Sequence, residues 1–319
     1  MPVTLQEAKK NVQDALTMGV IDEFAKSNYL LNSLTFDDAV SPTGGGATLT
    51  YGYTRLLTQP TAAFRAINSE YTPQEVSKQR HTVDLKVFGG SFQIDRIIAG
   101  MGGIVSEVTL QMQQKVKAAQ ALFNDTVING DSAVDANAFD GLEKALTGSS
   151  TEFNAAGSVL DLSSATALDS NYKVFLDMMD EFLVKLHAKP SCLLVNQKMW
   201  ARMRACARRA GMYQESKDSF GRNIDTYDGI PFIDVGEKPG TNDMVIPVDT
   251  TAKTTGIYAV CLGLDGFHGV SMAGQSPVKT WLPDFTTAGA VKPGEVEMVA
   301  AVALKATKAA GVFRKIKVG

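Results

Sequence analysis

The longest regular pattern of hydrophobic positions predicts one long helix. Between about Gly102 and Ile128 the apolar residues recur at steps of three and four, at Val105, Val108, Met112, Val116, Ala119, Phe123 and Val127. This spacing places them on one face of a helix. At 1.5 Å per residue the helix would be about 40 Å long, above the usual length in a globular domain. We expect Asn129-Gly130 to end it, because both residues tolerate the left-handed backbone conformation.

Two stretches of alternating polarity predict a long antiparallel hairpin. Residues 47–56 read ATLTYGYTRL, and residues 81–95 read HTVDLKVFGGSFQID. A period of two is typical of strands, with one face made by Leu49, Tyr51 and Tyr53 in the first and by Val83, Leu85 and Val87 in the second. The connecting region is too polar to bury, so we expect the hairpin to protrude and to meet another molecule.

The rest of the chain alternates between helical and strand patterns. Residues 4–36 predict one or two amphipathic helices, and SPTGGG at 41–46 breaks them off. After a linker-like stretch at 148–164 the order is helix, strand, helix, at 171–187, 191–197 and 198–211. Further strands are predicted at 230–235, 244–249 and 256–263, and in the alanine-rich tail 295–318. The class is therefore α+β, with a mixed α/β body between residues 165 and 275.

Composition and charge narrow the functional classes. The chain has 319 residues, of which 45% are hydrophobic and 20% charged, as in soluble globular proteins. No apolar run is long enough for a bilayer span, and the N-terminus lacks the apolar core of a secretory signal. Three isolated cysteines indicate a reducing compartment. The net charge of −3 argues against a dedicated nucleic-acid binder but leaves weak local contact with DNA open.

The stretch FNDTVINGDSAVDANAFDGL at 123–142 has the carboxylates of a calcium loop but not the spacing. A calcium loop of the EF-hand type needs oxygen ligands at positions 1, 3 and 5 and a bidentate Glu at position 12. Counted from Asp125, position 3 is Val127 and position 12 is Ala136. Asn and Asp are also favoured in turns, where their side chains bond to nearby backbone groups. We therefore predict turns and no metal site.

No catalytic pattern stands out elsewhere. The histidines His81, His187 and His268 are far apart and none belongs to a zinc-binding motif. The chain has no G-x-S-x-G elbow, and its glycine-rich pieces do not match a phosphate loop. We expect no enzyme activity, no cofactor and no metal. An α/β enzyme with a lid hairpin and an unrecognised site remains an alternative.

One basic cluster is concentrated enough to consider as a contact patch. It consists of Arg202, Arg204, Arg208 and Arg209 on the predicted helix 198–211. The cluster could contact acidic neighbours or nucleic acid. A solvated helix face with local salt bridges is the alternative, and we favour it.

Several motifs together resemble the major capsid proteins of tailed bacteriophages. TVINGDSAVDANAFDGL at 126–142 resembles their helix-end motif, in which the spine helix stops at an Asn-Gly-Asp turn. CLLVNQKMWARMRA at 192–205 and GRNIDTYDGIPFIDV at 221–235 are similar to a strand–Asn–helix–Trp segment and a later strand of that family. IYAVCLGLDGFHGVS at 257–271 resembles the strand that follows. The order and spacing agree from about residue 20 to the C-terminus.

The resemblance implies the Hong Kong 97-like fold. It maps an N-terminal arm to 1–43, an extended loop to 44–92, a peripheral domain to 93–165 with 273–319, and an axial domain to 166–272. It implies a structural protein of the virion that assembles in the bacterial host cytoplasm. Hexamers and pentamers of it would form an icosahedral head shell around double-stranded DNA.

The resemblance also indicates partners and an alternative function. Some members begin with a cleaved scaffolding segment, for which we see no room before this arm, so we expect any scaffold to be a separate protein. Portal and decoration proteins and weakly held DNA are further expected partners, and a membrane is not. The alternative is an encapsulin, a compartment with the same fold that holds an enzyme cargo. We expect contacts between subunits at the hairpin tip, through Phe64, Arg65, Glu70 and Tyr71.

Overall fold

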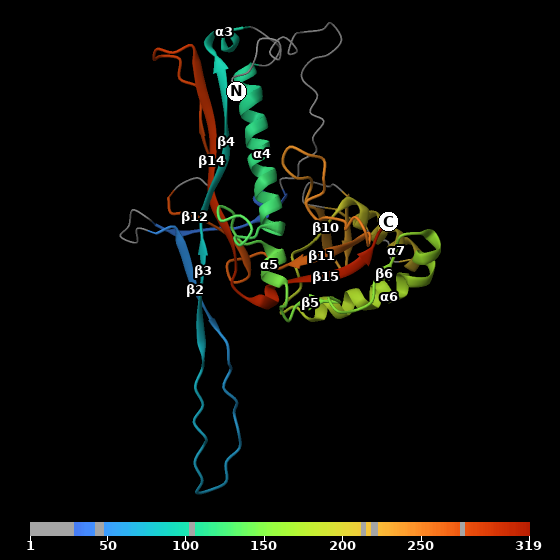
Figure 1. Ribbon diagram of the computed structural model, residues 1–319. Coiled ribbons are helices and arrows are strands. Elements are labelled where there is room, and N and C mark those ends of the chain that lie inside the picture. Colours follow the sequence, from blue (N-terminus) through green and yellow to red (C-terminus); the bar gives the residue numbers. More distant parts are fainter. Residues whose placement is uncertain (1–28, 42–47, 102–105, 212–214, 218–222, 275–277) are drawn as a thin grey trace.

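The long helix expected from the hydrophobic stripe is α4, Glu107–Asn129. The computed structural model describes residues 29–41, 48–101, 106–211, 215–217, 223–274 and 278–319 (Figure 1). The stripe residues Ala119, Phe123 and Val127 are buried, whereas the predicted first turn at 102–105 lies outside the described residues. The helix packs on two long strands, β4 (Lys86–Asp95) and β14 (Val291–Leu304).

The end of α4 is correctly predicted, but the reason is different. Gly130 has φ −60° and ψ 134°, an extended conformation that any residue can adopt. What requires glycine is space, because a Cβ atom on Gly130 would lie 2.3 Å from the carbonyl oxygen of Phe139. On Gly141 a Cβ atom would lie 2.5 Å from the carbonyl oxygen of Thr126. The loop after α4 therefore folds back tightly against the last turn of the helix.

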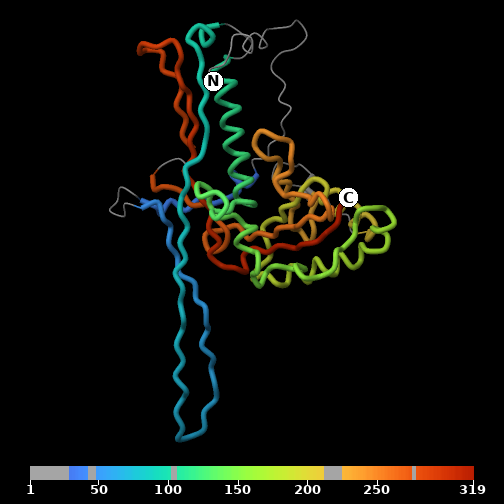
Figure 2. Tube along the Cα trace, viewed as in Figure 1, coloured from blue at the N-terminus to red at the C-terminus, as the bar shows by residue number. Residues whose placement is uncertain are grey.

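The predicted hairpin is confirmed as β2 (Thr50–Leu56) paired with β3 (Lys78–Asp84), in antiparallel register from Thr50 opposite Asp84 to Leu56 opposite Lys78. The expected inward position of Val87 is wrong, since this side chain is 54% exposed. Leu85 lies between β3 and β4, and past it the buried positions change from odd to even numbers. Figure 2 shows the hairpin running away from the rest of the molecule.

A five-stranded sheet continues the line of the hairpin. Its order is β1 (Phe36–Val40), β12 (Phe267–Met272), β14 and β13 (Val278–Trp281), and β4 also pairs with β14. The short helix α3 (Arg96–Ala99) follows β4 at the end of the molecule opposite the hairpin (Figure 1). Of the predicted helical segment 4–36, residues 1–28 lie outside the described residues. The remainder forms α2 (Tyr29–Ser33) and then enters β1, which pairs in parallel with β12.

The second sheet has eight strands and carries two helices. Its order is β5 (Glu152–Phe153), β15 (Ala310–Lys317), β11 (Thr254–Val260), β7 (Cys192–Val195), β10 (Ile230–Asp234), β9 (Asn223–Tyr227) and β8 (Glu215–Lys217), with β6 (Leu160–Asp161) also on β15. The helices α6 (Ala165–Val184) and α7 (Gln197–Ala210) pack on this sheet. The side chains of Ser164 and Asn196 cap them, each accepting a hydrogen bond from a backbone N–H of the first turn. The serine cap starts α6 earlier than the predicted residue 171.

The remaining short elements join the two sheets. The helix α5 (Leu142–Leu146) follows the loop after α4, and the 3₁₀ turn η3 (Thr307–Ala309) connects β14 to β15. The stretch 148–164, expected to be a linker, contributes β5 and β6. The alanine-rich tail forms β14 and β15, as predicted. Among the described residues, no helix is long and apolar enough to cross a membrane.

The strand predicted at 244–249 is wrong. Only an isolated bridge between Met244 and Glu237 forms there. Val245 and Ile246 are buried, which explains their apolar character. Their carbonyl oxygens accept hydrogen bonds from the side-chain amides of Asn129, at 2.7 Å, and Asn196, at 3.0 Å. Because these amides satisfy the carbonyl groups, the segment packs as a loop between α4 and α7.

Strand pairing differs in two places from the domain division expected from the resemblance. The strand β12 lies within 166–272, which was assigned to the axial domain, but it pairs with β1 and β14 of the five-stranded sheet. The segment 273–319 was assigned as a whole to the peripheral domain. Within it, β14 pairs with β4, as that assignment requires. In contrast, β15 pairs with β11 and therefore belongs to the sheet of the expected axial domain. The other boundaries stay a prediction.

Candidate assembly surfaces

The hairpin tip exposes large side chains that nothing in the described chain covers. All residues from 56 to 80 are exposed. Phe64 is 107% exposed and Tyr71 is 59% exposed. The Arg65 guanidinium lies 5.5 Å from the centre of the Tyr71 ring and donates to the carbonyl oxygen of Ser69 at 3.1 Å. The structure thus places the four predicted contact residues together at the tip, and their role stays a prediction.

The base of the hairpin, which the sequence did not single out, is fastened to the body. The hydroxyl of Tyr53 donates to the carbonyl oxygen of Leu304 at 2.9 Å, and Nε of Arg55 donates to that of Lys305 at 2.7 Å. A second Arg55 nitrogen also donates to the Leu304 oxygen. These two carbonyl groups lie at the end of β14, where the strand ladder stops. Their bonds fix the hairpin where it leaves the sheet.

A further layer of contacts at the base involves aromatic rings. The Tyr53 and His81 rings stack with their centres 5.7 Å apart, across the β2–β3 pair. The hydroxyl of Tyr51 donates to Asp37 of β1 at 2.7 Å, and the Tyr51 ring meets buried His268 edge to face. Burial and the nearby Arg55 lower the pKa of His81. The hairpin is therefore held against both β12 and β14 while its tip stays free.

Exposed apolar side chains also gather at the opposite end of the molecule. Here α3 adjoins the connection between β13 and β14, because the backbone N–H of Arg96 donates to the carbonyl oxygen of Ala290 at 2.9 Å. The exposed residues at this end are Ile97, Met101, Trp281, Leu282, Phe285 and Val291. Exposed apolar side chains do not stabilise a monomer, so this end of the molecule is a second candidate surface for contact with another molecule.

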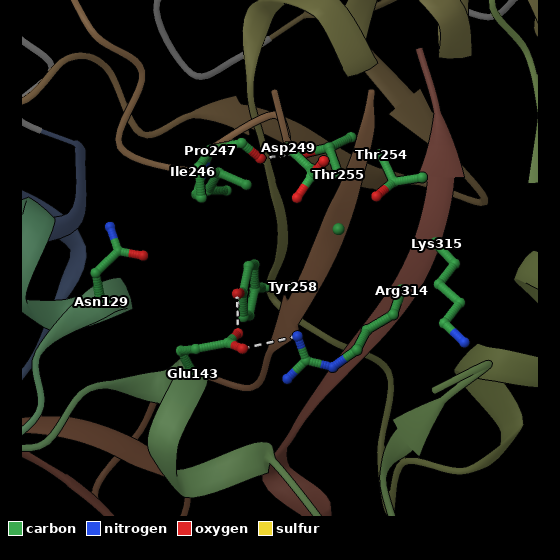
Figure 3. Close-up of a pocket in the computed structure, with 11 residues that line it drawn as sticks. Asn129, Glu143, Ile246, Pro247, Asp249, Thr254, Thr255, Tyr258, Arg314 and Lys315 are labelled. Atoms are coloured by element: carbon green, nitrogen blue, oxygen red, sulfur yellow. Dashed lines mark hydrogen bonds and ion pairs between the residues drawn. The ribbon is translucent and has the colours of Figure 1, made fainter. Parts of the chain in front are cut away.

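A pocket of about 430 Å³ lies where α5 meets β11 and β15 (Figure 3). At its wall, the Tyr258 hydroxyl donates to Glu143, whose carboxylate also lies 2.7 Å from Arg314. Arg314 forms a second ion pair with Glu152 of β5. Burial and the adjacent Glu143 raise the pKa of Tyr258. These groups satisfy one another, so the arrangement serves as a polar joint between helix and sheet.

The carboxylates of the loop after α4 are used by the loop itself. Asp131 and Asp140 both lie within 2.8 Å of the Lys144 ammonium group. Asp131 also accepts from the backbone N–H of Ala133, and Asp135 accepts from that of Asn137. The hydrogen bond from Lys144 is the main cause that lowers the pKa of Asp131. These are turn contacts, as predicted. Within the described parts of the chain, no group of three His, Cys, Asp or Glu side chains could hold a metal ion.

Three of the four predicted basic residues are engaged within the chain. Arg202 donates to the carbonyl oxygens of Ser163 and Val318. Arg209 and Arg204 form ion pairs at 2.5 Å with Asp169 and Asp225, respectively. Only Arg208 is exposed and has no ion pair among the described residues. The favoured interpretation, a helix face with local salt bridges, describes most of the cluster.

The cysteines have the properties of packing residues. Cys192 and Cys206 are buried, which raises the pKa of their thiols to about 12 and about 11. Burial also raises the pKa of Cys261, which is half-buried. Thiols of this kind stay protonated at neutral pH and are poor nucleophiles.

Comparison with known proteins gives a fold but no sequence relative. No protein-family model matches the chain, and no curated protein matches it in sequence. Among solved structures, the holo-SrpI encapsulin complex of Synechococcus elongatus is similar with TM-score 0.65 and 14% identity, covering 100% of this chain and 97% of that one. A chain of Mycobacterium phage Adephagia has TM-score 0.59 and 13% identity, with 100% and 99% covered. The capsid of Myoviridae phage XM1 has TM-score 0.57 and 11% identity, with 94% and 96% covered.

These matches extend over nearly the full length of both chains. Because two of them cover 100% of this chain, they include the hairpin, the spine helix and both sheets. The expectation from the sequence motifs is confirmed at the level of the fold. The chain therefore has the Hong Kong 97-like fold shared by phage capsids and an encapsulin.

Proposed function

We propose that the chain is the major capsid protein of a tailed bacteriophage. In this function, hexamers and pentamers of it close an icosahedral head shell around the double-stranded DNA genome. The observation that carries the proposal is the hairpin, whose base is bonded to β14 while residues 56–80 are exposed throughout. Exposure of Phe64 and Tyr71 to water is unfavourable unless another molecule covers their apolar surface.

Two further observations support an assembling structural protein. The second apolar surface, at α3 and the β13–β14 connection, lies at the opposite end of the long axis from the hairpin tip (Figure 1). Different surfaces at the two ends of a subunit favour head-to-tail contacts, which close into rings. The solved structures with this fold include capsids of phages and of a gene-transfer-agent particle. In this proposal the tip residues Phe64, Arg65, Glu70 and Tyr71 contact a neighbouring subunit.

The proposal includes a location and partners. The protein belongs to the virion and is assembled in the cytoplasm of the bacterial host. A separate scaffolding protein, a portal and decoration proteins are its proposed partners, and it contacts packaged DNA weakly. The division into arm, extended loop, peripheral and axial domains is part of the same proposal, and the pairing of β15 with β11 supports including β15 in the axial domain.

The second candidate is an encapsulin-type shell around an enzyme cargo. The observation in its favour is the similarity to the encapsulin chain, which extends over all of this chain with TM-score 0.65. The subunit fold is common to both candidates, so they differ in what the shell encloses. A test must therefore measure the contents of the particle as well as its form.

Electron microscopy of the purified protein, with nuclease-protected DNA measured on the same sample, separates the candidates. A phage capsid protein is expected to give uniform closed shells, and particles from an infected or induced host should protect long DNA. Closed shells with a co-purifying enzyme and no protected DNA would support the encapsulin. Discrete monomers that turn over a substrate would contradict both and favour an enzyme with a lid hairpin.

A further inference from the structure

An exposed stripe on α6 combines acidic and apolar side chains. Asp177 and Glu181 are exposed on the same helix face as Val174 and Val184. Val174 is 47% exposed and Val184 is 82% exposed. Among the described residues, none forms a hydrogen bond or ion pair with the carboxylate of Asp177 or Glu181. The face is thus apolar enough to gain from burial and carries unpaired negative charge.

More negative charge lies beside this stripe. The Tyr227 hydroxyl donates to Asp180 at 2.6 Å. Burial raises the pKa of Tyr227, and so do the nearby carboxylates of Asp180, Asp228 and Asp177. The acidic groups sit in the C-terminal half of α6, toward the end of the helix where the dipole is also negative. Lys189 pairs with Asp228 at 3.0 Å. Among the described residues no cation pairs with Asp177, Asp180 or Glu181, so a cation of another molecule would find free carboxylates here.

The adjacent helix α7 exposes a complementary surface. A shallow hollow of about 380 Å³ is lined by Gln197, Trp200, Ala201, Arg204 and Arg208. The Arg204 guanidinium lies 5.8 Å from the centre of the Trp200 ring, and both side chains bond to the carboxylate of Asp225, which holds them in place. Arg208, at the rim, is exposed and forms no ion pair with any residue that the structure describes. Ala201 leaves room at the centre for a close helix contact.

The two surfaces cannot meet within one chain. The helices α6 and α7 pack side by side on the eight-stranded sheet, away from α4 (Figure 1). Their buried faces, with Phe175 and Met179 on α6 and Met203 and Cys206 on α7, point to the sheet and to each other. The stripe and the hollow lie on the outer faces of their helices and point to solvent. Contact between them requires a second molecule.

We propose that the acidic α6 stripe of one copy docks in the α7 hollow of a second copy, with Glu181 facing Arg208. The contact rests on the proposed shell function, since it joins subunits within the assembly. Side chains of one helix then fill the groove of the other, with the valines over Ala201. Tryptophan and arginine are the residues that most often anchor such contacts. Opposite charges on the two surfaces also exclude pairing of either surface with itself.

Charge reversal tests this contact in three variants. Arg208→Glu and Glu181→Arg each place like charges across the interface, and the double variant restores opposite charges. We expect each single variant to lower the fraction of protein that sediments as shells by about fivefold or more, because like charges that face each other across an interface repel. The double variant should recover to within about twofold of the native protein. Lys308→Glu, an exposed residue outside both surfaces, serves as the control and should assemble normally.

Circular dichroism and melting temperature of dissociated subunits establish that each variant is folded. Normal assembly of both single variants would overturn the contact while leaving the shell function intact. A double variant no better than its parents would also overturn it. Arg208→Glu shells that lose protected DNA but form in native yield would assign the hollow to nucleic acid instead and reject docking. A native protein that forms no shells would overturn the proposed function and this contact together.

Discussion

The backbone nitrogen of Gly141 lies 2.8 Å from the carbonyl oxygen of Gly130, and this hydrogen bond closes the Asn- and Asp-rich loop behind the last turn of α4. Neither glycine has room for a Cβ atom. The carboxylates in between bond to Lys144 and to backbone amides of the loop. The loop thus anchors the spine helix to α5, and its residue pattern reflects close backbone packing.

The first prediction follows from this close approach. Gly141→Ala should lower the free energy of unfolding of the dissociated subunit by about 2 to 3 kcal/mol, as overpacking of a tight site does. The added methyl group would meet the carbonyl oxygen of Thr126 at 2.5 Å, and backbone atoms cannot move aside cheaply. Gly100→Ala is the matched control, since its nearest contact would be an ordinary 3.4 Å. Equal denaturation midpoints for the two variants would refute the argument.

The second prediction concerns the base of the hairpin. Arg55→Ala should increase amide hydrogen exchange in β2 and β3 by about 5- to 30-fold, which corresponds to a loss of about 1 to 2 kcal/mol of local stability. Its guanidinium donates to the carbonyl oxygens of Leu304 and Lys305 at the end of β14. Within the described chain, no other group donates to the Lys305 carbonyl oxygen.

Arg80 provides the control for this measurement. It faces Thr54 across the same pair of strands, and its side chain is exposed. Arg80→Ala should leave exchange near the native rate. The account of the hairpin base fails if Arg55→Ala keeps native protection or if both variants lose it equally.

The third prediction concerns stability in mild acid. Burial, followed by the nearby Lys305, lowers the pKa of His268, while Asp37 and Asp265 oppose this. The unfolded chain, with a histidine pKa of about 6.5, therefore binds the proton more readily than the folded chain does. His268 costs no stability above about pH 6.5, and the folded state loses stability as the pH falls below that value.

His268→Phe removes this titration and keeps an aromatic ring against Tyr51. Between about pH 7.5 and about pH 5 the unfolding free energy should fall less for the variant than for the native protein. Below the pKa of the unfolded chain, the difference between the two should grow by up to about 1.4 kcal/mol per pH unit. His81 also has a lowered pKa but is retained in both proteins, so its effect cancels. Parallel curves for the two proteins would show that His268 does not titrate as described.

The sequence was sufficient for the long and regular elements. The stripe of α4, the alternation of β2 and β3, and the strand and helix at Cys192–Val195 and Gln197–Ala210 could be predicted, because each contains its own periodic signal. The tip of the hairpin could also be located, because the region that connects the two strands is too polar to be buried.

The errors arose where distant residues decide the outcome. Met244–Asp249 has the composition of a strand, but the amides of Asn129 and Asn196 take its carbonyl groups. Arg55 gave no signal, since its acceptors are backbone atoms about 250 residues away in sequence. The apolar surface at α3 could not be recognised either. In the sequence its large apolar residues cannot be distinguished from core residues, because only the three-dimensional structure shows that they are exposed.

The most direct test of the central claim is deletion of residues 60–76, the outer part of the hairpin. These residues are exposed, and their side-chain hydrogen bonds stay within the segment, so the subunit should remain folded with a native melting temperature. We predict that electron microscopy of the purified deletion variant will show dispersed subunits and no shells, whereas the native protein prepared alongside forms shells. Normal shells from the deletion variant would contradict the proposal that the hairpin joins the subunits of a capsid.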